Sequence, residues 1–361
     1  ISARALNRAT LARQFLLERE PMDPLVAIER LAGLQAQTPH TWYIGLWSRL
    51  APFDADEAGD LLTERRAVRM ALMRATIHIV SAADALWMRP VLAPVITRTL
   101  GHHAGQLRGI DMAALARAAR AVVESEPLTA ASLGRRLAER WPERDPAALA
   151  QAARAQLGLV QVPPRGVWRR SGPAAHTTIE KWLAKPLSHA PGGLETLVMR
   201  YLSAFGPATV ADAEAWSGLP GLGEAFARLR PDLAVFTREA GDEVFDLPDA
   251  PRPDPETPAP ARLLYEHDNV LRGHADRGRF HRPSGPPPPW NREGPSPGAV
   301  LLDGLVRGTW TLARDGSRIV LAVNRIGRYT RADTDAVTEE AVALLSFLSS
   351  SAETDVRFTG P

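Results

Sequence analysis

The sequence predicts an α+β protein made of three successive helical units, each closed by a β-hairpin, and a β-rich C-terminal part. Three observations support this prediction. A group of three or four helices followed by a hairpin occurs three times, a proline-rich stretch follows the third copy, and 361 residues are many for a single core. This order is typical of winged helix-turn-helix units. We therefore divide the chain into 1–110, 111–190, 191–250 and 251–361.

The first unit is predicted to begin with helices at 4–19 and 24–34. The second helix has Asp23 as its cap and a proline in its first position. Shorter helices are expected at 43–50 and 56–65. The stretch 68–80 is rich in β-formers and breaks near Arg74, which predicts the first hairpin.

The second and third units repeat this order with threonine caps. Thr129 and Thr209 each begin a short helix, followed by alanine residues that permit close helix packing. In the second unit, Asp145 begins a third helix, and a hairpin around a Pro-Arg-Gly tip is expected at 160–172. In the third unit, helices at 193–206 and 222–233 flank the threonine-capped helix, and a hairpin follows at 234–247.

The C-terminal part begins after a linker. Six prolines from Pro248 to Pro260 predict extended backbone, and a second proline-rich stretch, Pro283 to Pro297, predicts an exposed loop. Strands expected at 261–271, 299–316 and 317–330 predict a small barrel or curled sheet, with a hairpin turn at Asp315-Gly316. Glu266, His267 and Asp268 are placed on the first strand in a structural role. A helix from Asp333 to Ser350, capped by Thr334 or Asp335, closes the chain.

Composition excludes several classes of protein. The chain has no cysteine, and its nine histidines show no HExxH spacing, so we expect no metal and no other cofactor. The chain contains no apolar run of about 20 residues. Arginines interrupt the apolar stretches near the N-terminus, which argues against a secretory signal. We therefore expect a cytoplasmic protein without a membrane span.

The basic residues are distributed unevenly. All 43 except Lys181 and Lys185 are arginines, for which a GC-rich genome is a sufficient cause. Residues 65–110 carry seven arginines against one acid, whereas residues 212–256 are strongly acidic. This separation of charge is what a protein with one face toward a polyanion requires.

The segment LAGLQAQTPHTWYIGLW contains two glutamines, Gln35 and Gln37, in a position that could carry chemistry. On a continuous helix they would lie roughly 200° apart. Pro39 disfavours helical backbone at the residue before it, so the helix is predicted to end between them. Both amides would then lie at a helix C-terminus beside Trp42. Taken alone, such glutamines more often cap carbonyls or face water.

Six blocks, in this order, change that interpretation. LAGLQAQTPHTWYIGLWSRL, RATIHIVSAAD, WRRSGPAAHTT, GPATVADAEAWSGL, LPDAPRPDPETPAPARLL and HDNVLRGHADRGR resemble the AlkZ-like winged-helix DNA glycosylases over nearly the whole chain. The resemblance implies tandem winged helices, a C-terminal β-barrel and a C-shaped body. It implies removal of bulky N7-alkylated purines from double-stranded DNA, including azinomycin-type interstrand cross-links, in self-resistance or base-excision repair. It also implies a catalytic Gln-aliphatic-Gln motif, which is Gln35-Ala36-Gln37.

The implied chemistry suits amides. A guanine alkylated at N7 is cationic and leaves as a neutral base, so the reaction needs a positioned water more than a strong acid. Gln37 would accept a hydrogen bond from that water, and Gln35 would orient the water or lay its dipole against the sugar cation. We therefore expect cleavage of cationic adducts only, at a rate that is nearly flat across neutral pH.

DNA contacts are expected from arginines in the hairpins and in the HADRGR segment. A cross-linked base cannot be extruded, so we expect an open cleft, lined by Trp42, Thr76 and His78. Each arginine taken alone is more often a solvated surface residue, and His78 is as often structural. The expected contacts are Arg69, Arg74, Arg165, Arg169, Arg170, Arg277 and Arg279.

The two lysines lie far along the chain from the glutamines, which favours hydrolysis without strand cleavage, although the N-terminal amine remains an alternative nucleophile. We expect a monomer associated with the nucleoid. Two other functions fit parts of the pattern. One is a tandem winged-helix transcription regulator, and the other is a protein that sequesters a DNA-reactive drug.

Overall fold

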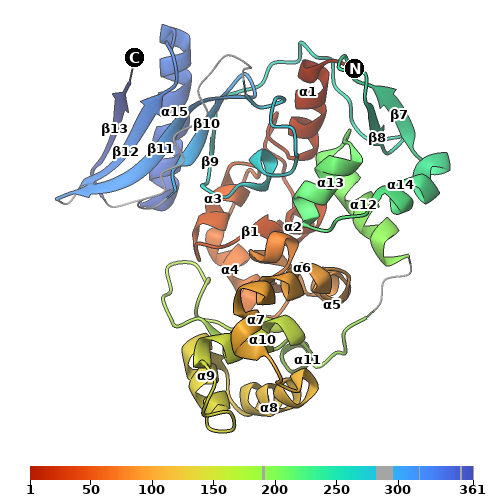
Figure 1. Cartoon of the computed structure of the whole chain (residues 1–361). Coiled ribbons are helices and arrows are strands. Elements are labelled where there is room, and N and C mark those ends of the chain that lie inside the picture. Colours follow the sequence, from red (N-terminus) through yellow and green to blue (C-terminus); the bar gives the residue numbers. More distant parts are fainter. Residues whose placement is uncertain (189–191, 282–295, 317, 350–351, 361) are drawn as a thin grey trace.

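The computed structural model describes all residues except 189–191, 282–295, 317, 350–351 and 361. In Figure 1 the first hundred residues occupy the middle of the molecule. The C-terminal sheet stands at one end, and the lobe containing helices α8–α10 stands at the other. The molecule therefore has the outline of an open arc. Within the described ranges, no helix is long and apolar enough to cross a membrane.

The first hundred residues form short helices around a β-hairpin. Asp23 caps the second helix as predicted, its carboxylate accepting from the backbone N–H of Leu25 and Val26. That helix ends at Arg30, four residues earlier than predicted. Gly33, with φ at +87°, then turns the chain into a strand. The elements are α1 (Ala3–Arg13), α2 (Pro24–Arg30), β1 (Leu34–Gln35), α3 (Thr41–Trp47), α4 (Ala55–Thr63), β2 (Ala67–Ala71), η1 (Met73–Ala75), β3 (Ile77–Ser81), α5 (Ala82–Val91), α6 (Ala93–Thr97), η2 (Arg98–His103) and α7 (Ala104–Leu107).

The middle of the chain shows the predicted order of helices and strands. Thr129 and Asp145 cap the second and third helices, as predicted, and Asp111 caps the first. Gly134 is required where two of these helices meet, because a Cβ there would lie 2.2 Å from the carbonyl oxygen of Pro146. The elements are α8 (Met112–Ser125), β4 (Leu128–Thr129), α9 (Ala130–Ala138), α10 (Pro146–Gln156), β5 (Leu159–Gln161), β6 (Ala175–Thr178) and α11 (Ile179–Leu183).

One six-stranded sheet crosses the boundary that we placed at residue 110. Its strand order is β1-β3-β2-β5-β6-β4, and β2 pairs with β5 through Arg69 opposite Gln161 and Met70 opposite Val160. The hairpin expected at 160–172 is more open than predicted, because β5 and β6 pair antiparallel but residues 162–174 between them form a long connection. This connection packs back on the first helices, where the Tyr43 hydroxyl donates to the Gly166 carbonyl at 2.9 Å.

The next segment contains three helices and the predicted hairpin. Its elements are α12 (Gly193–Phe205), α13 (Val210–Ser217), α14 (Gly223–Leu229), η3 (Arg230–Asp232), β7 (Ala234–Thr237) and β8 (Glu243–Asp246). Thr209 caps α13 in a capping box with Asp212. A buried ion pair ties this segment to α1, because the Arg13 guanidinium donates to both carboxylate oxygens of Asp246, at 2.6 and 2.8 Å.

The C-terminal part is an open sheet covered by a helix. Its strand order is β13-β12-β11-β10-β9, and β13 pairs with β12 in parallel. No pairing between β13 and β9 closes this sheet in the described ranges, so the predicted barrel is not found there. The elements are β9 (Arg262–Leu264), η4 (Asn269–Leu271), β10 (Gly298–Leu302), β11 (Leu305–Asp315), β12 (Arg318–Arg325), α15 (Arg331–Leu348) and β13 (Thr354–Thr359).

Several C-terminal predictions can be compared directly with this structure. The linker Pro248 to Pro260 contains no helix or strand, as predicted, and β11 and β12 form the predicted hairpin. Helix α15 is capped by Thr330 with Asp333, not by the residues we expected. The predicted loop Pro283 to Pro297 falls outside the described residues except for its last two positions.

The first hundred residues share a core with each of their neighbours. One apolar cluster joins α2, α3 and α4 to the C-terminal sheet and α15, with Trp42, Leu321 and Leu344 fully buried. A second cluster joins β2, β3 and α5 to α12 and α13, with Met88 and Trp216 fully buried. Leu34 of β1 belongs to the first cluster, and Ala32, two residues before it, belongs to the second.

Candidate active site

The glutamine motif lies at the end of a strand, not at the end of a helix. Gln35 is opposite His78 in the β1–β3 pairing, and its side chain is buried. The Ala36 N–H donates to the Ile77 carbonyl at 2.8 Å. The side-chain Oε1 of Gln37, which is exposed, accepts from the Ile77 N–H at 3.2 Å. The prediction of a helix ending between the glutamines was therefore wrong, and the two residues lie at the end of a strand.

The Gln35 amide is oriented by an arginine. Arg74 Nη2 donates to Gln35 Oε1 at 2.9 Å and to Asn269 Oδ1 at 2.9 Å, while Nη1 donates to the Trp216 carbonyl. Arg74 has a positive φ of 54° at the tip of the first hairpin. Burial, with the nearby charge of Arg272, lowers the pKa of Arg74 to about 10. The Gln35 oxygen therefore faces Arg74, and its NH₂ group is left for other partners.

His78 is a fully buried and neutral neighbour of Gln35. Its Nδ1 lies 3.0 Å from the Thr76 carbonyl, so this nitrogen carries the proton, and Nε2 is an acceptor. No hydrogen-bond partner of Nε2 is found in the described part of the chain. Burial, and then the Arg74 charge, lower the pKa of His78 to about 3, so the ring does not titrate near neutrality.

Arg69 is not available to DNA, contrary to the prediction. Its guanidinium is buried, and Nη2 donates to the Ala36 carbonyl at 2.6 Å. Ala36 is the residue between the two glutamines. Arg69 therefore holds the backbone of the motif through this hydrogen bond. Burial lowers the pKa of Arg69 to about 10.

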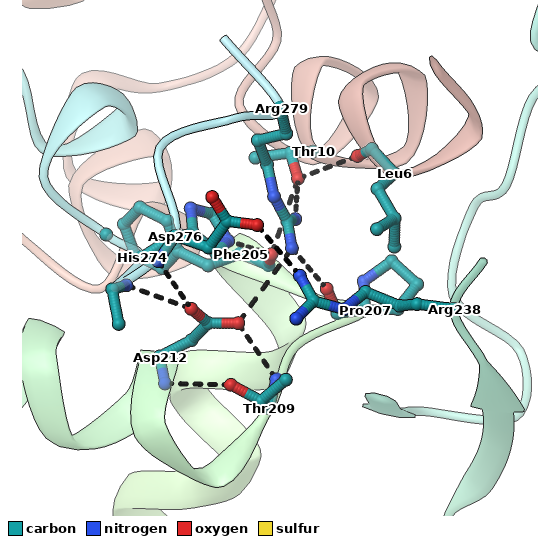
Figure 2. Close-up of polar contacts among 12 residues, drawn as sticks. Leu6, Thr10, Phe205, Pro207, Thr209, Asp212, Arg238, His274, Asp276 and Arg279 are labelled. Carbon is teal, nitrogen blue, oxygen red and sulfur yellow. Dashed lines mark hydrogen bonds and ion pairs between the residues drawn. The ribbon is translucent and has the colours of Figure 1, made fainter. Parts of the chain in front are cut away.

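Arg279 is also buried, and the prediction that it contacts DNA is wrong. It donates to the Thr10 hydroxyl at 2.8 Å and to the Pro207 carbonyl at 3.1 Å, and it lies 4.0 Å from the Asp212 carboxylate (Figure 2). Asp212 accepts in turn from the backbone N–H of Ala275 at 2.9 Å. This network holds the segment 274–279 against α13 and α1.

The other predicted arginines remain accessible to different degrees. Arg277, at the turn of the same segment, is exposed, as are Arg169 and Arg170 in the connection 162–174. Arg169 lies 5.6 Å from the Trp168 ring, and half-buried Arg165 donates to the Gly172 carbonyl at 3.1 Å. None of these four guanidinium groups forms an ion pair with a carboxylate in the described ranges.

The residues predicted to line a cleft are not those found at the cavity beside the motif. Trp42 is fully buried and donates to the Pro39 carbonyl at 3.0 Å, so it cannot line an open cleft. His78 is buried as well, and the half-buried Thr76 donates to the Met73 carbonyl. A cavity of about 700 Å³ lies beside Gln37 and is lined by Ile77 and by residues of β5, β6, α9 and α10.

Asn269 is a residue that the sequence analysis missed. It accepts from Arg74, and its Nδ2 donates to the Gly33 carbonyl at 3.2 Å, which ties η4 to the turn before β1. The only signal was its place in the HDNVLRGHADRGR block. Glu266, His267 and Asp268 lie in a turn, not on the predicted strand. Asp268 forms a buried ion pair with Arg49 at 2.8 Å.

The fold and the site together define a protein of mixed α and β structure with two glutamines at a strand end, one held by the Arg74 guanidinium and the other by the Ile77 N–H. Residues 28–347 match the family described as AlkZ-like, DNA glycosylase AlkZ-like, and the chain belongs to this family. It is therefore a DNA glycosylase, a hydrolase acting on N-glycosyl bonds.

A solved structure supports the same fold. The chain is similar to the Streptomyces sahachiroi DNA glycosylase AlkZ, with a TM-score of 0.76 and 21% sequence identity. The similarity covers 99% of this chain and 100% of that one. No curated protein matches the sequence.

Proposed function

We propose that the protein hydrolyses the N-glycosidic bond of bulky N7-alkylated purines in double-stranded DNA, including azinomycin-type interstrand cross-links. It would serve self-resistance or base-excision repair. The observation that carries this proposal is the pair of glutamines at the end of β1, in which each amide oxygen is held by a donor. Gln35 Oε1 is held by Arg74, and Gln37 Oε1 accepts from the Ile77 N–H.

These orientations give each glutamine a distinct role. Gln37 Oε1 uses one lone pair for Ile77, and the second can accept a hydrogen bond from a water molecule. Gln35 presents its NH₂ group, which can donate to the oxygen of that water. Since the positive end of the Gln35 dipole is then outward, we assign Gln35 to orienting the water and not to stabilising the sugar cation.

The absence of a strong base in this assignment limits the substrates. An amide oxygen stabilises a water without taking its proton fully, so only a base that leaves readily can be released. A purine alkylated at N7 is cationic and meets this condition. Uracil and undamaged bases do not, and we expect no release of either.

For the architecture, we propose three winged helix-turn-helix units, with the boundaries given above, and a C-terminal β unit. The proposed DNA contacts are the accessible arginines Arg165, Arg169, Arg170 and Arg277, whose guanidinium groups lack carboxylate partners among the described residues. We propose hydrolysis without strand cleavage, because both catalytic candidates are amides, and a monomeric, nucleoid-associated enzyme.

The test is release of base from duplex DNA carrying a single 7-methylguanine. The native chain is compared with Gln37→Ala and with Gln156→Ala, a control at an exposed glutamine at the end of α10. We expect release by the native chain and the control, loss of release in Gln37→Ala, and DNA binding by all three. DNA binding without release by the native chain would contradict the proposal and favour a transcription regulator.

A further inference from the structure

A cavity of about 700 Å³ opens beside Gln37, and neither glutamine's proposed role explains it. One wall is a face of the six-stranded sheet, where Gln161 of β5 is paired with His176 of β6. Much of the remaining lining comes from α9 and α10, with His103 of η2. The lining is largely apolar and includes Ile77, Ala130, Ala131, Leu133, Pro146, Ala147, Ala150 and Leu159. A volume of roughly 300–1,000 Å³ is usual for pockets that hold drug-sized ligands.

The polar groups in this cavity include an acceptor without a partner. Gln161 Oε1 is buried and accepts no hydrogen bond in the described part of the chain. A buried carbonyl oxygen without a donor costs free energy, so a ligand that brings a donor would be favoured there. His176, across the strand pair, is neutral at pH 7 because burial lowers its pKa to about 4. The cavity surface is mostly apolar, with Arg135, Arg154 and Asp145 among its polar members, so it favours an apolar group that carries a hydrogen-bond donor.

We propose that this cavity, the Gln37 cavity, binds the substituent carried by the damaged base. The substituent would be an apolar, drug-sized group, aromatic or aliphatic, with a hydroxyl or amide N–H that donates to Gln161. This inference rests on the proposed function, because Gln37 can act at the glycosidic bond only if the base lies next to it. A group attached to that base is then within reach of the cavity that Gln37 lines.

The size and lining of the cavity distinguish this ligand from the base itself. A 7-methyl group would leave the cavity almost empty. A base alone would bring several polar atoms to a surface that is mostly apolar. Binding of the substituent would give the enzyme a preference for bulky adducts, without extrusion of the base from the duplex.

The test compares three duplexes, which carry 7-methylguanine, 7-(naphthylmethyl)guanine or 7-(hydroxynaphthylmethyl)guanine. Ala147→Phe fills the cavity from an exposed position on the first turn of α10. The matched control is Ala121→Phe, at an exposed position of α8 that does not line the cavity. Gln161→Leu removes the unpaired acceptor.

We expect Ala147→Phe to raise KM for both naphthyl adducts about tenfold and to leave release of 7-methylguanine within a factor of two. We expect Gln161→Leu to abolish a roughly threefold to tenfold preference for the hydroxylated adduct. Equal effects of Ala147→Phe on all three substrates, or equal effects of the control, would overturn the cavity assignment and leave the proposed function intact. Failure of the native chain to release any of the three bases would overturn the proposed function itself.

Binding of free 2-naphthol provides a further control. Fluorescence titration is expected to show only weak binding by the native chain, because the DNA supplies most of the affinity of the adduct. Tight binding of free naphthol that Ala147→Phe removes, together with no preference among the three adducts, would overturn the proposal in favour of drug sequestration.

Discussion

Arg74 and Gln35 are joined by a hydrogen bond of 2.9 Å from the guanidinium group to the amide oxygen. The same guanidinium nitrogen donates to Asn269. Because an amide has its donor and its acceptor at opposite ends, this bond fixes which end of Gln35 is free. A hairpin tip, a strand end and η4 are thereby held in one arrangement.

Replacing Arg74 tests this arrangement. In Arg74→Ala, Gln35 can rotate, and we expect the single-turnover rate of 7-methylguanine release to fall about 10- to 100-fold with the Kd for DNA nearly unchanged. The loss of three hydrogen bonds also lowers the free energy of unfolding, by about 2 kcal/mol. Single-turnover release assays measure the change in rate, and denaturant titrations measure the change in the free energy of unfolding. A fall in DNA affinity with an unchanged rate would show that Arg74 contacts DNA instead.

Arg277 and Arg279 lie two residues apart and are expected to behave in opposite ways. Arg277 is exposed, so Arg277→Ala should weaken DNA binding and reduce the slope of log K against log salt by about 1, with stability unchanged. Arg279 is buried between Thr10, Pro207 and Asp212, so Arg279→Ala should cost about 3 kcal/mol of stability. Salt-dependent binding and thermal unfolding of both variants check this prediction. Equal loss of stability in the two variants would contradict it.

The local signals in the sequence predicted local structure well. Asp23, Thr129 and Asp145 cap helices as expected, since a capping side chain acts on backbone groups only two or three residues away. The glutamine pair was identified through the family resemblance, but its backbone was not. The pairing of β1 with β3 joins residues about 40 positions apart, and Pro39 alone suggested a helix end.

Burial of charged residues was the main failure of the sequence analysis. Arg69 and Arg279 were predicted to contact DNA together with the exposed Arg169 and Arg277, and the sequence analysis did not distinguish the two pairs. Their burial depends on partners that are distant in sequence. Arg69 donates to Ala36, 33 residues away, and Arg279 donates to Thr10, 269 residues away. Only the tertiary structure separates a phosphate ligand from an internal anchor.

Gly33 sets the direction of the strand that carries the motif. Its φ is +87°, and a Cβ there would lie 2.6 Å from a methyl carbon of Val80. We therefore expect Gly33→Ala to lower the free energy of unfolding by about 2 kcal/mol and to reduce base release more than DNA binding, because β1 is displaced. Gly101→Ala is the matched control, since a Cβ there meets no atom within 4 Å. Similar unfolding curves for the two variants would argue against this role of Gly33.

The buried histidines should make the free energy of unfolding, but not the rate of base release, depend on pH. The folded-state pKa of His78 is lowered to about 3 by burial, whereas the unfolded imidazole titrates near 6.5. Between these values the unfolded chain binds a proton that the folded chain does not. The contribution of His78 to the free energy of unfolding is therefore complete above pH 6.5. It is lost as the pH falls toward 3, at roughly 1.4 kcal/mol per pH unit. His274, lowered to about 3, acts in the same direction.

The rate of base release should not follow this titration, because the assigned groups are amides and His78 stays neutral above its pKa. We expect a nearly flat rate from pH 6 to 8, with unfolding free energies from urea titrations that decline below pH 6.5. His78→Leu should be less stable at pH 7, because the bond to the Thr76 carbonyl is lost, but its stability should fall less steeply toward pH 4. A slope equal to that of the native chain would exclude His78 as a source of the acid sensitivity. A sharp inflection of the rate near pH 7 would require a titrating catalytic group in place of the glutamine pair.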